Sequence, residues 1–398
     1  MRPSRRTLVS ALWIAVVAFN LRPAITGVGP VLPDVETGLG LSGVEAALLT
    51  TLPLACFGLL GPAGPGLARR LGLELTLGAA LGVITVGILL RSGPNVATLY
   101  IGTALAGCAI AVCNVLLPAV VKRDFPRHPG LATGAYTTVL GGTAALSAAV
   151  AVPLGHAVGR GWRGALGIWL VPAAIAFVVW LPRLRGHTRP PRTEAAAGVR
   201  ALLRDPLAWA LSFYMGIQSL LFYATAAWLP TLYQARGYSE TDAGLILAVL
   251  TVVGLPTGII VPTLAARRRD QRAWAAGGAV WTAIGLAGIT FAPTAAPYVW
   301  AVILGTGVGA TFPLALTLVV LRSRTAHDTA RLSAFSQSVG YLIAALGPVV
   351  VGALHDVTGS WRTAFLLLLA LTVPELLFGF ASGRSGYVAS TPQRARAG

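Results

Sequence analysis

The sequence predicts an all-α integral membrane protein with twelve transmembrane helices, arranged as two related halves of six. Three observations lead to this prediction: the composition, the spacing of the apolar runs and an internal repeat. Of the 398 residues, 55% are hydrophobic and only 11% are charged, whereas soluble domains have about 25% charged residues. So few charges cannot cover a soluble protein of this size, and the composition also excludes disordered, collagen-like and disulfide-scaffold classes.

Twelve apolar runs are long enough to cross a bilayer, which takes about 20 mainly apolar residues in a helix. The first run follows a basic N-terminal segment and shows no small-residue cleavage site, so it is expected to be a membrane helix and not a removable signal peptide. The predicted spans are residues 9–32, 43–67, 73–91, 95–121, 130–157, 162–181, 206–232, 240–265, 273–292, 296–321, 331–354 and 361–381.

One long polar stretch, residues 182–205, interrupts this series after the sixth span. It contains six arginines and three prolines, a composition typical of a linker and not of a packed element. The sequence therefore predicts an N-terminal six-helix bundle over residues 1–181, a basic linker over 182–205, and a C-terminal six-helix bundle with a short tail over 206–398.

The net charge of +17 is explained by membrane topology and not by nucleic-acid binding. Of the 30 Lys and Arg residues, 24 fall in the termini, the linker and the loops of one side, five fall on the opposite side, and Arg22 lies inside a span. Basic residues gather on the cytoplasmic side of membrane proteins. We therefore expect both termini and the linker in the cytoplasm, and the chain in the cytoplasmic membrane of a bacterium.

The two halves repeat each other in the same orientation. A shift of 197 residues places Leu32-Pro33 on Leu229-Pro230 and Gly61 on Gly258. A shift of 199 residues places the rare residues of the fifth and sixth spans on those of the eleventh and twelfth: His156, Trp162 and Arg163 on His355, Trp361 and Arg362. Both copies begin on the same side, so the repeat is parallel.

Twelve spans, a parallel six-plus-six repeat and a basic central linker resemble the major facilitator superfamily over nearly the whole chain. The superfamily's loop signature after the second span is degenerate here, because Gly72 fits but Arg69 stands at the Asp position. Within the first span, the stretch from Asn20 to Pro30 is similar to that of the cyanate and 2-nitroimidazole permease branch. The resemblance implies a secondary transporter of a small polar or anionic organic solute that works by alternating access.

Arg22 is the sharpest functional candidate. It lies near the middle of the first span, where a charge costs about 2.5–3.5 kcal/mol on insertion scales and must face a cavity or a partner. One interpretation is a guanidinium that holds a carboxylate, cyanate or nitro group through two parallel hydrogen bonds. The alternative is a structural strut, paired internally or bonded to carbonyls. The neighbouring Pro23 disturbs the helix at this point.

Nine further polar or aromatic residues lie at a compatible depth and are predicted to bind substrate. The alternative for each is a buried hydrogen bond between helices. The halves are expected to meet around the first, fourth, fifth, seventh, tenth and eleventh spans, with Gln218 facing Arg22. The nine candidates are Asn20, Asn114, Tyr136, Tyr214, Gln218, Tyr223, Phe312, Gln337 and Tyr341.

The remaining ionisable residues in the spans have two interpretations each. His156 and His355 form a symmetric pair at the outer ends of their spans, as structural caps or as a route for proton coupling. Glu375 in the last span is expected to serve helix packing. The three cysteines, Cys56, Cys108 and Cys113, have no spacing of a metal or redox motif.

No enzyme motif is found in the sequence. Gly305-x-Gly307-x-Gly309 lies inside a span with no preceding strand, so it is not a nucleotide-binding loop, and no Walker loop exists. We expect no catalytic activity, and no cofactor, metal or nucleic-acid partner. The protein is expected to be a monomer that binds a small-molecule substrate and uses protons as the coupling ion. Alternatives are an exporter of hydrophobic compounds with the same fold, an enzyme acting on lipid-linked substrates, and a membrane sensor.

Overall fold

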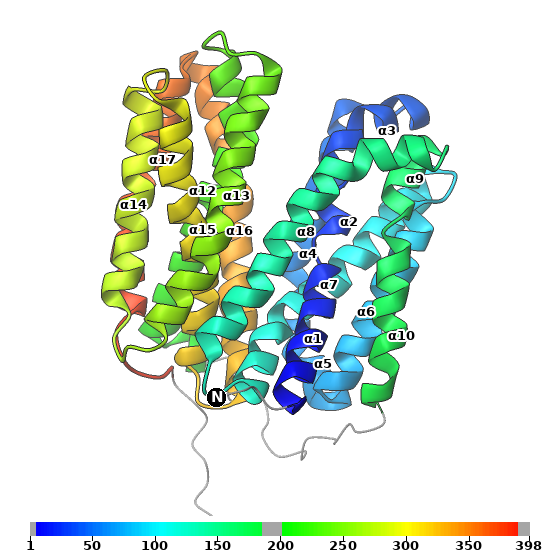
Figure 1. Ribbon diagram of the computed structural model, residues 1–398, viewed down its shortest axis with the longest axis vertical. Helices are drawn as coiled ribbons and strands as arrows, with labels where there is room; N and C mark the ends of the chain where they lie inside the picture. The colour runs from blue at the N-terminus through cyan, green and yellow to red at the C-terminus, as the bar shows by residue number, and fades with distance from the viewer. Residues whose placement is uncertain (1–4, 185–200, 389–398) are drawn as a thin grey trace, which may run out of the picture.

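The computed structural model describes residues 5–184 and 201–388, and these form two helical bundles side by side (Figure 1). The N-terminal bundle contains α1 (Arg5–Phe19), α2 (Pro23–Thr26), the short 3-10 helix η1 (Gly29–Val31), α3 (Leu32–Leu39), α4 (Gly43–Leu60), α5 (Ala63–Leu71), α6 (Leu73–Arg91), α7 (Val96–Asp124), α8 (Pro129–Ala157), α9 (Gly161–Gly167) and α10 (Leu170–Leu184). The C-terminal bundle contains α12 (Pro206–Gln234), α13 (Glu240–Ala265), α14 (Arg272–Phe291), α15 (Pro297–Leu321), α16 (Ala326–Thr358) and α17 (Trp361–Ser382).

The predicted twelve spans agree with the helices of the described residues. Eleven helical segments are long and apolar enough to cross a membrane, and the twelfth span is the pair Leu48–Leu60 and Ala63–Leu71, bent by 61°. The third span matches its prediction at both ends, whereas the eleventh is longer, because α16 runs over 33 residues. It starts early because Thr325 caps it by accepting from the Asp328 amide at 3.1 Å, a polar first turn that hydropathy does not detect.

Equivalent caps begin the second span of each half. Ser42 and Glu45 form a capping box at the start of α4, and Ser239 accepts from the Asp242 amide at the start of α13. The hydrogen bonds from Ser42 hold the pKa of the Glu45 carboxyl below its usual range. Acidic residues in the first turn also interact favourably with the positive end of the helix dipole. These acids therefore stabilise the start of each helix.

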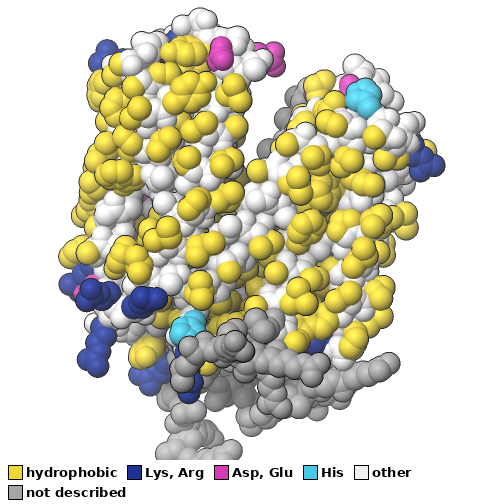
Figure 2. Space-filling model, in the orientation of Figure 1, with side chains coloured by type: hydrophobic (Ala, Val, Ile, Leu, Met, Phe, Trp, Pro, Cys, Tyr) yellow, Lys and Arg dark blue, Asp and Glu magenta, His cyan; other side chains and the backbone are white. Residues whose placement is uncertain are grey.

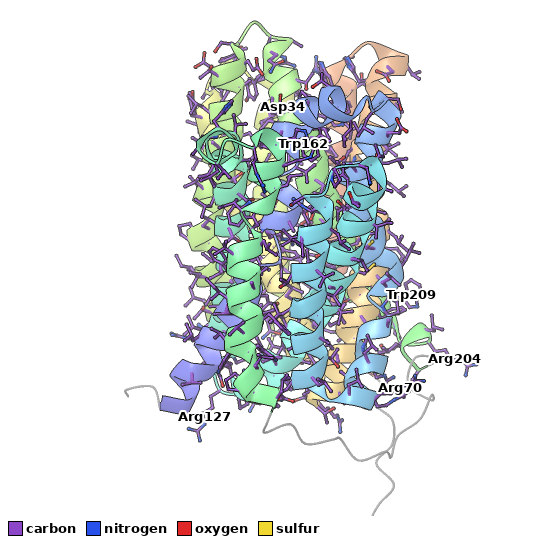
Figure 3. All side chains as sticks on the ribbon, turned by 90° about the vertical axis from the view of Figure 1, so that its right-hand side faces the viewer. Asp34, Arg70, Arg127, Trp162, Arg204 and Trp209 are labelled. Atoms are coloured by element: carbon purple, nitrogen blue, oxygen red, sulfur yellow. The ribbon has the colours of Figure 1, made fainter. Side chains whose placement is uncertain are left out.

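The two bundles touch at one end of the molecule and separate at the other. Figure 2 shows the surface hollowed between them at the end away from the start of α1. We call this the open end, and the opposite one the closed end. Figure 3 places Arg70, Arg127 and Arg204 at the closed end and Asp34 and Trp162 near the open end. The excess of basic residues on the predicted cytoplasmic side therefore gathers at the closed end.

The contact at the closed end differs in part from the expected one. α8 packs against α13, and α4 and α7 pack against α16, so the second and eighth spans join the interface between the halves. Glycines allow this approach: a Cβ on Gly134 would lie 2.7 Å from the Gly258 carbonyl oxygen and 2.8 Å from the Ile259 Cα. The first and seventh spans instead line the space that the closed end seals.

Candidate ligand-binding cavity

The first span is broken where it faces the space between the halves. α1 ends at Phe19, and the chain turns through Asn20–Arg22 before α2 begins at Pro23. Pro23 has no amide hydrogen and cannot bond the Phe19 carbonyl, as a continuous helix requires. The Asn20 and Leu21 amides bond carbonyls only three residues back, at 3.0 and 3.2 Å. The break therefore follows from the local sequence and turns Arg22 out of the regular helix.

A cavity of about 220 Å³ lies between the two halves at this break. Apolar residues and glycines form most of its wall, with hydroxyl and amide groups interspersed. Arg22 is the one charged residue among the described residues that line it. The lining residues are Arg22, Ile25, Thr26, Leu54, Thr137, Thr138, Leu140, Gly141, Ala144, Gln218, Ser219, Phe222, Tyr223, Leu250, Thr251, Gly254, Leu255, Gly258, Gly305, Val308, Gly309, Phe312, Pro313 and Tyr341.

The guanidinium of Arg22 has no acidic partner. It is half-buried and interacts with the hydroxyl groups of Tyr223 and Tyr341, which come from the other half. Within the described part of the chain, no carboxylate takes part in that interaction. The Tyr341 hydroxyl has no hydrogen bond of regular geometry, so its contact with Arg22 is electrostatic. No carboxylate of the described residues competes for the donors of the guanidinium, which are therefore shared between the two tyrosine hydroxyls and a ligand in the cavity.

Side-chain hydrogen bonds hold the two walls of the cavity on either side of Arg22. Thr26, one turn after Arg22, bonds the Ser147 hydroxyl at 2.6 Å and the Ala144 carbonyl at 3.2 Å, both on α8. On the opposite wall, the Gln218 amide group donates to the Ser219 hydroxyl at 2.6 Å and to the Met215 carbonyl at 3.0 Å. These bonds hold the walls in place around the cation.

Five of the ten predicted binding residues line the cavity: Arg22, Gln218, Tyr223, Phe312 and Tyr341. The other five are buried between helices outside its lining. Among these, the Gln337 amide group donates to the Asn114 carbonyl at 3.1 Å and to the Ser333 hydroxyl at 2.7 Å. The amide group of Gln337 and the backbone of Asn114 therefore join the two halves and do not line the cavity.

The remaining three also lie in packed helices. The Asn20 side chain donates to the Val16 carbonyl at 2.9 Å, within its own helix. Tyr136 and Tyr214 are 3% and 0% exposed, and their hydroxyls have no hydrogen-bond partner among the described residues. Tyr136 lies close enough to Tyr341 for the two hydroxyls to interact, so it backs the cavity wall without reaching the space.

Sequence reasoning missed the small polar residues of the lining. Thr137 and Thr138 come from α8, Thr251 from α13 and Ser219 from α12, and the eighth span was not expected to contribute at all. Threonine and serine also occur on helix faces where they bond their own backbone, as Thr251 does to the Leu247 carbonyl at 2.9 Å. Composition alone therefore could not tell which of them face the cavity.

The histidine pair lies away from the cavity. His156 is exposed near the end of α8, and His355 stacks on Trp361 with ring centroids 3.8 Å apart. Neither residue lines the cavity. Glu375 is fully buried in α17, and neither of its oxygens has a partner among the described residues. The packing role expected of Glu375 stays a prediction.

Two helical bundles with a cavity between them define a class of membrane transport proteins, and comparison with known proteins identifies the family. The profile of the Major Facilitator Superfamily matches residues 12–342. The chain is 39% identical over 381 residues to the "2-nitroimidazole transporter" of Escherichia coli (strain K12), covering 96% of each chain. It is 31% identical over 372 residues to the "Cyanate transport protein CynX" of the same organism, covering 92% of this chain and 96% of that one.

A solved structure supports the fold. The proton:xylose symporter XylE, bound to 6-bromo-6-deoxy-D-glucose, matches with a TM-score of 0.79 at 14% sequence identity, over 96% of this chain and 97% of that one. The chain belongs to the Major Facilitator Superfamily. It is a multi-pass membrane transporter related to nitroimidazole and cyanate permeases, and the predicted fold and family are confirmed.

Proposed function

We propose that this chain is a secondary active transporter that moves a small polar or anionic organic solute across the cytoplasmic membrane by alternating access, with Arg22 as the group that holds the solute. The observation that supports it most is one guanidinium that faces a cavity between the halves and has no carboxylate partner among the described residues. A cation in a low-dielectric site needs a counter-charge, and a bound carboxylate, cyanate or nitro group supplies it.

The geometry of the guanidinium suits such groups. Arginine presents parallel N–H donors that match two oxygens of one planar group, and each hydrogen bond to a charged group contributes about 1.5–3 kcal/mol. The hydroxyls of Tyr223 and Tyr341 lie beside the guanidinium and supply further donors to a polar solute. The relatives named for cyanate and 2-nitroimidazole transport take solutes of this size and polarity.

The second candidate is the export of hydrophobic compounds. The apolar wall around Phe222, Leu255 and Phe312 favours it. The cavity of about 220 Å³ is, however, smaller than the roughly 300–1,000 Å³ of pockets for drug-sized ligands. The unpaired charge of Arg22 also disfavours an apolar ligand, because an apolar group leaves the cation without hydrogen bonds.

Substitution of Arg22 separates these functions. Purified Arg22→Ala should lose affinity for cyanate or 2-nitroimidazole by about 10- to 100-fold, since it loses one or more charged hydrogen bonds. Arg22→Lys keeps the charge but loses the paired donors, and it should also weaken binding. The melting temperature of Arg22→Ala should stay level or rise, because a costly charge is removed. The matched control is Arg160→Ala, an exposed arginine of the same half.

The strut interpretation predicts the reverse pattern. Arg22→Ala would then be unstable, and Arg22→Lys would bind as the unmodified protein does. Wild-type affinity in a stable Arg22→Ala protein would refute the proposal. A gain of transport for bulky apolar compounds in the same variant would favour the exporter.

The proposal includes orientation and energy source. The termini are cytoplasmic in this scheme, so an impermeant thiol reagent should label Asp34→Cys and spare Arg127→Cys in intact cells. Transport is driven by an ion gradient or by solute exchange, and the protein works as a monomer. Proton coupling through His156 and His355 stays a prediction, which the pH dependence of uptake by the paired His→Gln variants tests.

A further inference from the structure

Arg91 is a second buried cation in the N-terminal half. It is the last residue of α6 and, by position, was counted among the loop arginines of the open end. Its side chain is 0% exposed, and it turns inward to donate from Nη1 to the Ala24 carbonyl. Gly102 of α7 allows this burial, because a Cβ there would lie 2.3 Å from the Arg91 backbone nitrogen.

The carbonyl that Arg91 bonds has no helical partner, because the short helix α2 ends at Thr26. In a regular helix the Ala24 carbonyl accepts from the amide four residues later, which belongs to Val28. Here the Val28 amide donates to the Ile25 carbonyl at 3.3 Å instead. Ala24 lies two residues after Arg22 and inside α2, so a bond to its carbonyl fixes the segment that presents Arg22 to the cavity.

The charge of Arg91 is not neutralised within the described residues. Its Nε and Nη2 atoms are buried without hydrogen-bond partners, and no carboxylate of that part of the chain interacts with it. The carbonyl end of α6 favours a cation at this position. A cation in a low-dielectric interior acts over a longer range than one in water, so it raises the positive potential in the neighbouring cavity.

We propose that Arg91 is a positioning residue of the transport site, which holds the broken first span through the Ala24 carbonyl and adds a second positive charge behind Arg22. This inference rests on the proposed function of Arg22. Arg91 does not line the cavity, so it acts on a solute only through α2 and through its field. It thereby favours anionic over cationic solutes at the site.

Arg322 provides a matched control in the other half. It is also a buried arginine, 3% exposed, and it bonds the Ser382 carbonyl at 3.0 Å, the Gly383 carbonyl at 2.9 Å and the Gln271 side chain. Burial lowers the pKa of Arg322 to about 10. It lies at the closed end and far along the chain from the break. Arg322→Met should therefore reduce the melting temperature without changing the potential in the cavity.

The cavity potential is measured without any transported solute. A single cysteine at Ala144, which lines the cavity, is introduced after Cys56, Cys108 and Cys113 are replaced by serine or alanine. Its reaction rates with anionic sulfonatoethyl and cationic trimethylammonioethyl methanethiosulfonate are compared. Arg91→Met should lower the ratio of anionic to cationic rates by about 3- to 10-fold, as expected for removal of one nearby charge. Arg91→Lys should stay close to the unmodified ratio.

Cyanate affinity tests the positioning role in the same proteins. Arg91→Gln keeps a donor for Ala24 without the charge, and Arg91→Met keeps neither. The dissociation constant for cyanate should therefore rise in the order Arg91, Lys, Gln, Met, while a purely structural role would change only the melting temperature. If Arg91→Met fails to fold, Arg91→Gln decides the question with both readouts.

The outcomes separate this inference from the proposed function. An unchanged rate ratio and an unchanged cyanate affinity in Arg91→Gln would overturn the role of Arg91. If Arg22→Ala lowers both quantities at the same time, only the inference fails. If Arg22→Ala leaves both unchanged, the proposed function fails. Should the unmodified protein not bind cyanate, the rate ratio alone decides the role of Arg91.

Discussion

The first and seventh spans are equivalent in the internal repeat, yet they differ where they face the cavity. α12 is a single helix of 29 residues, whereas the first span is divided by the turn between Phe19 and Pro23. α12 contributes neutral groups, Gln218 and Tyr223, and the first span contributes a cation. The two walls of the cavity are therefore chemically unlike although the fold is symmetric.

The alignment of the repeat shows where this difference arises. The shift that places Leu32-Pro33 on Leu229-Pro230 places Arg22 on Ser219 and Pro23 on Leu220. The repeated proline lies inside α12 without dividing it. The unrepeated proline accompanies the break. The charge of Arg22 and the break at Pro23 therefore occupy adjacent positions and have no counterpart in the other half. The polarity of the site thus depends on a local departure from the symmetry of the repeat.

At the closed end the two halves remain alike. Gly61 and Gly258 are equivalent in the repeat, and both lie at the interface between halves. A Cβ on Gly61 would meet the Ser338 hydroxyl at 2.9 Å, and the Gly258 carbonyl oxygen lies 2.7 Å from a Cβ on Gly134. Equivalent glycines of the two halves therefore take part in sealing this end, whereas the charge of Arg22 and the break in the first span occur in one half only.

The largest expected effect comes from making the first span resemble the seventh. Pro23→Leu supplies the amide that can bond the Phe19 carbonyl, and an interior proline costs a helix about 3 kcal/mol. A regular helix would carry Arg22 away from its present position. We expect cyanate affinity to fall by roughly 30-fold or more, which is about 2 kcal/mol, with an equal or higher melting temperature.

Pro230→Leu is the matched control for that change, because it removes the repeated proline of α12. Its affinity should stay within about threefold of the unmodified protein, a difference below 1 kcal/mol. Isothermal titration of both variants gives the comparison. Wild-type affinity in Pro23→Leu would show that the break does not position Arg22.

The membrane-spanning helices could be predicted from the sequence, because long apolar runs reflect the thickness of the bilayer. The orientation inferred from the arginine distribution stays a prediction. The importance of Arg22 followed from the cost of a charge at its depth. The inward orientation of the Arg91 side chain could not be predicted. Position in the sequence gives the depth of a Cα atom in the membrane, but not where a long side chain extends. For the same reason Arg91 was assigned to a loop and is in fact buried.

Which side of each helix faces the cavity could not be predicted from the sequence either. α7 is apolar all round and its residues are mostly buried, so periodicity did not show whether Asn114 faces the cavity or the other half. In the structure the Gln337 amide group donates to the backbone carbonyl of Asn114, and the Asn114 side chain is buried outside the lining of the cavity. Gln218 and Tyr223 line the cavity because α12 lies opposite the first span, whereas the Asn20 side chain bonds the Val16 carbonyl of α1. That these residues bind a solute stays a prediction.

A smaller effect is expected where the halves are alike. Gly134→Ala places a methyl group against backbone atoms of α13, which cannot rotate away, so the closed end should open more readily. Gly142→Ala on the same helix meets nothing within 4 Å and serves as the control. A Ser338→Cys reporter at this interface, in a background without native cysteines, should react with a membrane-permeant maleimide about 10-fold faster in Gly134→Ala, equivalent to about 1.4 kcal/mol. Equal rates in the two variants would contradict the tight contact.

The smallest expected effect concerns a hydrogen bond between the halves at the closed end that has no counterpart in the repeat. Lys122 is the only lysine of the chain, and its Nζ donates to the Val320 carbonyl of the other half at 3.1 Å. The 199-residue shift places it on the neutral Leu321. Val320 lies in the last turn of α15, where carbonyls lack helical partners and favour a cation.

Lys122→Leu gives this position the residue of its repeat partner. The loss of one partly exposed charged hydrogen bond should speed the reaction of the Ser338→Cys reporter by about 3- to 10-fold and leave cyanate affinity nearly unchanged, because Lys122 does not line the cavity. Lys122→Arg keeps a cation in reach of the carbonyl and should react as the unmodified protein does. The contrary result is that Lys122→Leu weakens cyanate binding as strongly as Pro23→Leu. That result would mean that a residue of the closed end is part of the binding site. The asymmetric cavity and the closed end would then not be separate parts of the molecule.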